Sequence, residues 1–288
     1  LKLSQFDIPG SVLMMLGMVL LLASIQIYFR ADASNMVIVF GIIAIIILAL
    51  FFWVETHSST PIVPFGLFRV KGIMMGSLQA VTMGWINGSI QLVVPFLLIV
   101  GFGWSVAYAA SIMFFMGLVR PLARFVAGWA SDKFGSSAVV VSAGVAAAIG
   151  QLAITSAGMS PGLTIIVMAL ILMGLSQASM QTANQRQIFN SMPAGQLHLA
   201  PSFSLVLTTS GSSIALAFVA AILTGTSSIT TGSGIIDTTI VENSFLVIRV
   251  VTVIMAFGIL ASQLLPRMLG EKEKPDFSSV TGSPSTEN

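Results

Sequence analysis

Apolar runs of about twenty residues recur along this sequence and restrict what it can fold into. A helix needs about 20 apolar residues to cross a hydrocarbon core about 30 Å thick. Eight runs meet this requirement, at residues 9–28, 36–54, 72–100, 106–127, 137–156, 162–183, 201–223 and 244–265. The third run is long enough to be tilted, or to contain a break near Pro95.

The composition excludes an ordinary soluble domain. Hydrophobic residues make up 56% of the 288 residues, and charged residues only 8%, whereas soluble proteins carry roughly 25% charged residues. Too few polar side chains remain to cover a globule in water. The sequence therefore predicts an all-α polytopic membrane protein with about eight transmembrane helices, embedded in a lipid bilayer. The formal net charge of +2 does not indicate a nucleic-acid partner.

The distribution of basic residues predicts the orientation of the chain. Lys and Arg gather in the short cytoplasmic loops of membrane proteins. Placing Lys133 in the cytoplasm also puts most other loop cations there: Lys2, Arg69, Lys71, Arg186, Arg267, Lys272 and Lys274. Arg30 is the exception, and the acids Asp32, Asp237 and Glu242 fall outside. We expect a multi-pass protein of the cell membrane with both ends in the cytoplasm.

Segments between the apolar runs divide the chain into four parts. Residues 1–56 hold two linker helices, and residues 57–71 form an amphipathic cytoplasmic connector with two prolines. Residues 72–265 hold six helices. Residues 266–288 are charged and then rich in Ser, Thr and Pro, which is typical of a disordered tail.

The run GWASDKFG at residues 128–135 carries a family resemblance. It resembles the cytoplasmic loop signature G-x-x-x-D-[KR]-x-G of the major facilitator superfamily, with Gly128, Asp132, Lys133 and Gly135 at the defining positions. The glycines permit close packing and a tight turn, and the acid can face the positive end of a neighbouring helix. Serines stand where the signature usually continues with a basic pair.

Two further segments narrow the resemblance. The connector PIVPFGLFRVKG, residues 61–72, looks like the P-[IL]-x-P-x-x-L-F-R segment of the drug:proton antiporter-2 family of fourteen-span exporters. The segment FDIPG, residues 6–10, is similar to the start of that family's first extra helix. The resemblance implies two linker helices followed by the C-terminal six-helix half of a proton-driven exporter. It also implies three partners: an amphipathic small molecule, protons, and an N-terminal six-helix half that this sequence lacks.

Polar residues within two of the runs are candidates for a substrate cavity. Gln79, Met83, Asn87 and Gln91 follow one another at spacings of four, as do Met173, Gln177 and Gln181. This spacing keeps the side chains of each set near one face of a helix. In the superfamily that the chain resembles, the helices at these positions line the central cavity. Amides and methionines suit an amphipathic or cationic compound; alternatively, the amides only join packed helices.

Arg120 and Arg124 lie within the fourth run, on either side of Pro121. Arg124 is close enough to the cytoplasmic end to extend its side chain to the surface. Arg120 is one turn deeper, so it either faces the cavity or pairs with a carboxylate of the missing half. Arg249 is expected to pair with Glu242 or to reach the outer surface.

No pattern in the sequence indicates an enzyme. His57 and His198 lack a second ligand nearby, no phosphate-binding glycine loop is present, and no triad or paired acids appear. We expect no metal and no cofactor. None of the ten acids lies midway along an apolar run, so the chain is not expected to carry the proton alone. The alternatives are a truncated or non-transporting scaffold, and a lipid or metabolite exporter of the same fold.

Overall fold

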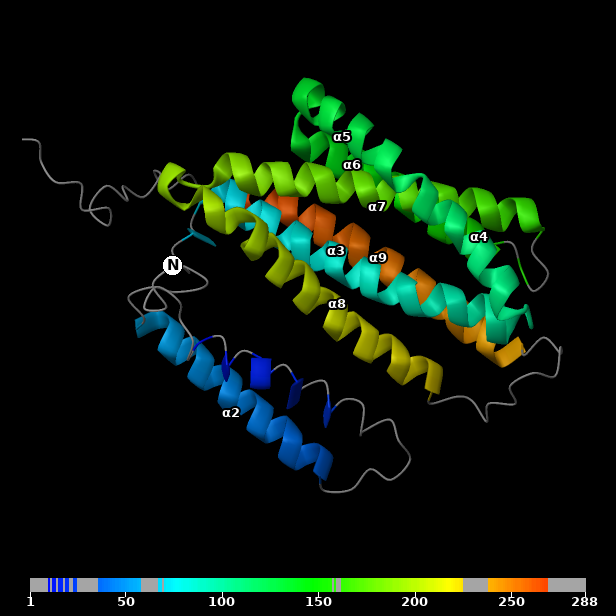
Figure 1. The fold of residues 1–288 in the computed structure, drawn as a ribbon, viewed down its shortest axis with the longest axis horizontal. Helices are drawn as coiled ribbons and strands as arrows, with labels where there is room; N and C mark the ends of the chain where they lie inside the picture. The colour runs from blue at the N-terminus through cyan, green and yellow to red at the C-terminus, as the bar shows by residue number, and fades with distance from the viewer. Residues whose placement is uncertain are drawn as a thin grey trace, which may run out of the picture.

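The chain folds into a bundle of long helices (Figure 1). The computed structural model describes residues 36–57, 70–156, 162–224 and 238–268, with isolated positions between 10 and 24 and at 67, 68 and 158. Across these residues every regular element is a helix, and no strand occurs. Six helical stretches here are long and apolar enough to cross a bilayer, and the shorter apolar stretch Val39–Phe51 adds to them. The prediction of an all-α polytopic membrane protein is confirmed.

The helices follow the predicted apolar runs closely. Their bounds are α2 Met36–His57, α3 Lys71–Phe96, η3 Leu97–Gly101, α4 Val106–Leu118, α5 Arg120–Phe134, α6 Ser136–Ser156, α7 Leu163–Ser191, η4 Ala194–Leu199, α8 Ala200–Thr224 and α9 Thr238–Met268. The run expected at residues 9–28 lies mostly outside the described residues. Helix α7 continues eight residues beyond the expected end, so Arg186 lies within a helix and not in a loop.

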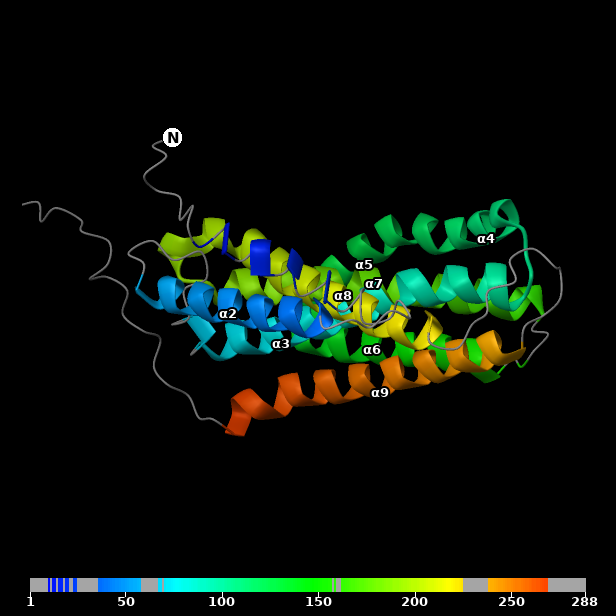
Figure 2. The same cartoon turned by 90° about the horizontal axis from the view of Figure 1, so that it is seen from below.

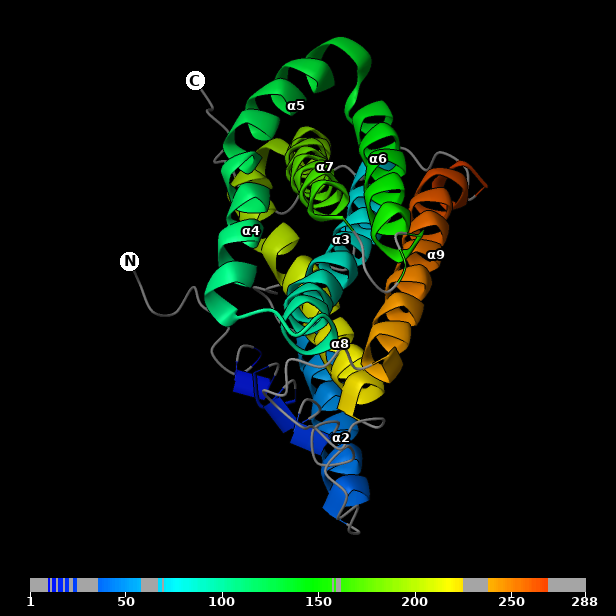
Figure 3. The same cartoon turned by 90° about the vertical axis from the view of Figure 1, so that its right-hand side faces the viewer.

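Helices α3 and α7 form the centre of the bundle. Helix α3 packs against α7, α8 and α9, and α7 also contacts α4, α5 and α6. Seen end-on, α4 and α5 form one flank and α6 and α9 the other, with α2 beyond α8 at the edge (Figure 3). The long axes of the helices run along one common direction (Figure 2), as expected for helices that cross one bilayer.

Glycines let α3 and α8 approach until their backbones touch. A Cβ atom added to Gly84 would lie 2.9 Å from the backbone nitrogen of Ser212 and closer still to the carbonyl oxygen of Thr208. A Cβ added to Gly88 would meet the backbone of Ser212 in the same way. The Ser212 hydroxyl donates a hydrogen bond of 2.9 Å to the carbonyl of Gly84. This contact uses the small residues that membrane helices favour where they pack closely.

Two of the spans are interrupted near a proline. Helix α3 contains Pro95 and gives way at Leu97 to the π-helical turn η3, which agrees with the break expected there. The fourth span divides at Val119 into α4 and α5, because Pro121 has no N–H with which to continue the helical bonding pattern. This division places Arg120 at the first residue of α5, midway along the stretch Val106–Phe134.

Candidate functional site

Three arginines join α5 to α7, and we call this set of contacts the arginine ladder. The first two rungs are hydrogen bonds from Nη2 of Arg120 to Oε1 of Gln177, 2.9 Å long, and from Nη2 of Arg124 to Oε1 of Gln181, 3.3 Å long. The third rung is Arg186 of α7, which forms an ion pair with Asp132 and donates to the carbonyl of Gly128 at 3.2 Å.

The register of two parallel helices produces the ladder. Both arginine–glutamine rungs join residues 57 positions apart in the sequence, which requires α5 and α7 to run in the same direction. The four-residue spacing on each helix keeps successive side chains near one face. Close approach is possible because Gly174 of α7 lies against the backbone carbonyl of Met116. A larger side chain there would push the α4–α5 segment away from α7.

Among the described residues, no negatively charged side chain pairs with the first two rungs. Gln177 is only 8% exposed, Arg120 is half-buried, and Arg124 is exposed on the bundle surface. Nε of Arg120 is buried and has no hydrogen-bond partner among the described residues. The ion pair of the third rung is the only one found in the part of the chain that the structure describes. The ladder therefore carries more positive than negative charge.

The predicted stripe on α3 turns from the bundle interior to its surface. Gln79 is fully buried, and its Nε2 lies 3.4 Å from the hydroxyl of Ser262 on α9. Met83 is 3% exposed and belongs to the apolar core. Asn87 is half-buried and Gln91 is exposed. Lining of a cavity by these residues stays a prediction, and Gln79 is placed where it also joins two helices.

The predicted set on α7 is divided in the same way. Met173 is completely buried and packs against Gly150 of α6. Gln177 and Gln181 accept the hydrogen bonds from Arg120 and Arg124 described above. Asn184, one turn further on, is 1% exposed and lies beside Gly76 of α3. The two glutamines thus face the arginines of α5, whereas Met173 and Asn184 lie in the packed interior.

The residues of the signature segment lie at the end of α5. Gly128, Asp132 and Lys133 belong to its last two turns, and Gly135 alone connects α5 to α6. Gly135 has a φ of 86°, a backbone conformation that side chains with a Cβ rarely adopt. The Lys133 ammonium lies 5.3 Å from the ring centre of Trp129, a cation–π contact at the helix end.

The sequence analysis did not predict the pairing of α5 with α7 through arginine and glutamine side chains. The matching four-residue spacings of Arg120 and Arg124 and of Gln177 and Gln181 were the available signal. A further missed contact joins α6 to α9, where the Thr252 hydroxyl donates to Oε1 of Gln151 at 2.5 Å. No pattern in the sequence identifies those two residues as partners.

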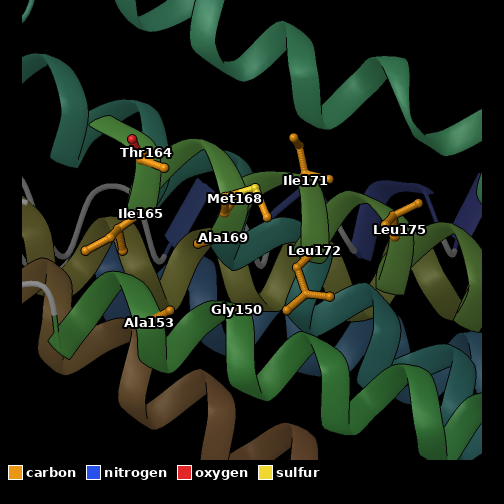
Figure 4. Close-up of a pocket in the computed structure, with 9 residues that line it drawn as sticks. All are labelled: Gly150, Ala153, Thr164, Ile165, Met168, Ala169, Ile171, Leu172 and Leu175. Carbon is orange, nitrogen blue, oxygen red and sulfur yellow. The ribbon is translucent and has the colours of Figure 1, made fainter. Parts of the chain in front are cut away.

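Grooves on the bundle surface differ in polarity. A groove of about 400 Å³ lies between α6 and α7, and Thr164 is the only polar residue among the nine that line it (Figure 4). A second groove of about 550 Å³ lies between α5, α6 and α7 and is mostly apolar. A third, of about 340 Å³, lies between α7 and α8 and includes Thr182, Gln185 and Arg186. The third groove therefore adjoins the last rung of the ladder.

Comparison with known proteins does not identify a family. No protein-family model matches the chain, and no curated protein matches it. Within the described residues, no group of three or more His, Asp or Glu residues is arranged to hold a metal ion.

Proposed function

We propose that this chain forms two linker helices and the C-terminal six-helix half of a secondary active exporter of amphipathic compounds. The exporter works by proton antiport with alternating access, and it resembles the drug:proton antiporter-2 family. The observation that supports this proposal is the arginine ladder inside membrane-spanning helices. An arginine at the centre of a transmembrane helix costs about 2.5–3.5 kcal/mol by insertion scales, so such residues usually face a polar path or a partner.

The exposure of the ladder supports a polar path along the surface of this bundle. Arg120 lies midway along its span, and Arg124 is exposed on the bundle surface. Asn87 and Gln91 of α3 also reach the surface of the bundle. Contact of these groups with lipid would be unfavourable. A second six-helix bundle that encloses a water-accessible path would cover them, and transporters bind substrate near the midplane between two such bundles.

The cytoplasmic end of the ladder supports the resemblance to the superfamily. Asp132 and Gly128 of the signature segment both contact Arg186, which ties the end of α5 to α7. The single-residue connection at Gly135 ties α5 to α6. Three helices are thereby joined at one end, as a body that moves as a unit requires.

The proton-carrying group is proposed to lie outside this bundle. The described helices contain three acids, Glu55, Asp132 and Glu242, and each lies within five residues of a helix end. An antiporter needs a carboxylate whose proton affinity changes as access alternates between the two sides. The chain is proposed to supply half of the cavity and half of the moving structure, in the cell membrane with both ends in the cytoplasm.

A non-transporting membrane scaffold is the second candidate. Two observations favour it: the contacts between Gln79 and Ser262 and between Thr252 and Gln151 lie inside the bundle and join helices. A lipid or metabolite exporter of the same fold is a variant of the first proposal, because a fold does not determine a substrate.

Dye extrusion tests the proposal. The natural gene product that carries this sequence is expressed in an efflux-deficient host, and accumulation of a panel of amphipathic dyes is measured with and without a proton uncoupler. We expect lower accumulation than in cells with an empty vector, and loss of this difference with the uncoupler. Extrusion that survives the uncoupler would refute proton coupling, and equal accumulation of every dye would favour the scaffold.

A further inference from the structure

The arginine ladder has one neutralised rung and two rungs that are not neutralised. Arg186 shows the neutralised arrangement, since the carboxylate of Asp132 pairs with it near the end of the helices. Among the described residues, the side-chain acceptors of Arg120 and Arg124 are neutral amide oxygens. The ladder is therefore least compensated at its deepest rung, where the surrounding membrane disfavours an isolated charge most.

Within the described part of the chain, most donors of these two arginines have no side-chain acceptor. A guanidinium carries five N–H donors in a planar fork. Among the described residues, Arg120 and Arg124 each make one hydrogen bond to a side chain, and Nε of Arg120 is buried without a partner. Arg124 lies four residues after Arg120 on α5, which is a rise of about 6 Å. Two forks one turn apart match an oxyanion with several acceptor oxygens.

The segment that holds the arginines is otherwise apolar. Between Ser111 and Ser131, all residues except Arg120 and Arg124 are aliphatic, aromatic, methionine, glycine or proline. A ligand that satisfies this segment needs an anionic head and an apolar body. A small hydrated anion would gain hydrogen bonds from the arginines, but it would have to give up its hydration water beside an apolar surface, which is unfavourable.

We propose that Arg120 and Arg124 bind the head group of an anionic amphiphile, with a carboxylate, sulfonate or phosphate as the head. This inference rests on the proposed function, because it names the class of compound that the exporter carries. It reverses the sign of charge that amides and methionines suggest from the sequence. Gln177 and Gln181 act as positioning residues, since they hold the two guanidinium groups through one hydrogen bond each.

The experiment compares fluorescent amphiphiles that share one tail and differ only in the head: sulfonate, trimethylammonium or neutral. Extrusion by the natural gene product is measured in energised cells for the wild type, Arg120→Gln, Arg124→Gln and Arg120→Lys. Arg249→Gln is the matched control, because it removes the same charge from the exposed side of α9, outside the ladder. Binding of the sulfonate probe to purified protein in nanodiscs is measured in parallel.

We expect the wild type to extrude the sulfonate probe faster than the trimethylammonium probe. A hydrogen bond between a guanidinium and an anionic head is charge-assisted, so Arg120→Gln should lower sulfonate extrusion and binding about tenfold or more. The neutral probe should be unaffected, Arg120→Lys should restore part of the loss, and Arg249→Gln should behave as the wild type. Fluorescent phosphatidylglycerol in proteoliposomes distinguishes a membrane lipid from a soluble compound as the source of the head group.

Equal loss of the sulfonate and trimethylammonium probes in Arg120→Gln would overturn the inference, because Arg120 would then not distinguish an anionic head from a cationic one. Binding that does not depend on Arg120 or Arg124 would also overturn it. If no probe is extruded but the sulfonate probe binds through the arginines, the site stands and the exporter function fails. If the trimethylammonium probe is extruded preferentially, and equally well by the arginine variants, the proposed exporter function stands and the proposed anion site is wrong.

Discussion

Substitution of Gly84 by alanine should separate α3 from α8. The added Cβ would lie 2.9 Å from the backbone nitrogen of Ser212 and closer to the carbonyl oxygen of Thr208. Ordinary van der Waals contact begins at 3.4 Å, so the nitrogen requires a shift of about 0.5 Å and the closer carbonyl oxygen a larger one. Both neighbouring atoms are backbone, and therefore no side chain can rotate away to make room.

The structure gives the size of this effect. A gap of 0.5–1 Å removes a quarter to a half of each dispersion contact. We take the contact region around Gly84 to be as large as that of one buried leucine side chain, which makes roughly 40–60 atom contacts at about 0.1–0.2 kcal/mol each. The loss is then about 1–6 kcal/mol, with mid-range values giving about 3 kcal/mol, and the hydrogen bond from Ser212 to Gly84 adds about 0.6 kcal/mol. The better helix propensity of alanine returns up to about 1 kcal/mol. The free energy of unfolding should fall by about 2 kcal/mol.

Thermal unfolding of the purified protein in detergent measures this loss. At about 2–4 °C for each kcal/mol, Gly84→Ala should lower Tm by about 4–8 °C. Gly117→Ala is the matched control, because Gly117 is also helical but a Cβ there has nothing within 4 Å. Its Tm should be unchanged or slightly higher. If Gly84→Ala and Gly117→Ala both melt with the wild type, the close backbone contact between α3 and α8 is wrong.

Two further predictions concern polar residues of the bundle. Asn87→Ala should change the relative extrusion rates of a dye panel, because Asn87 is partly exposed. Gln79→Ala should lower Tm and leave those rates unchanged, because Gln79 is fully buried. The reverse result would contradict this assignment of the two residues. In a double-mutant cycle with Asp132→Asn and Arg186→Gln, the coupling energy should stay below about 1 kcal/mol, because the two side chains are 61% and 36% exposed. A larger value would show that another part of the assembly shields the pair from water.

The sequence by itself determined the class of the protein and the approximate positions of the apolar helices that the structure describes. Apolar runs determine which segments enter lipid, because the cost of burying charge in the membrane outweighs local preferences. The break near Pro95 was also predictable, since a proline within a helix removes a backbone donor whatever surrounds it.

The ends of the helices beyond lipid depended on tertiary packing. Helix α7 continues to Ser191, although its residues after 183 are largely polar. Ile188 is fully buried and lies against Gly76 of α3, and Ser191 lies against Gly72. These contacts stabilise a helical end that hydropathy alone does not mark, because hydropathy reports the solvent around a segment and not its neighbours.

Only the tertiary structure decided which polar groups meet. The sequence places Arg120 and Gln177 on separate spans, and their pairing follows from the parallel register of α5 and α7. The tertiary structure likewise decided that Gln79 faces α9, whereas Gln91 on the same stripe reaches the surface. A four-residue spacing advances a helix by 400° and not by a full number of turns, so a stripe drifts around its helix. Helix packing determines where such a stripe contacts a neighbouring helix, and a single amino-acid sequence does not specify that packing.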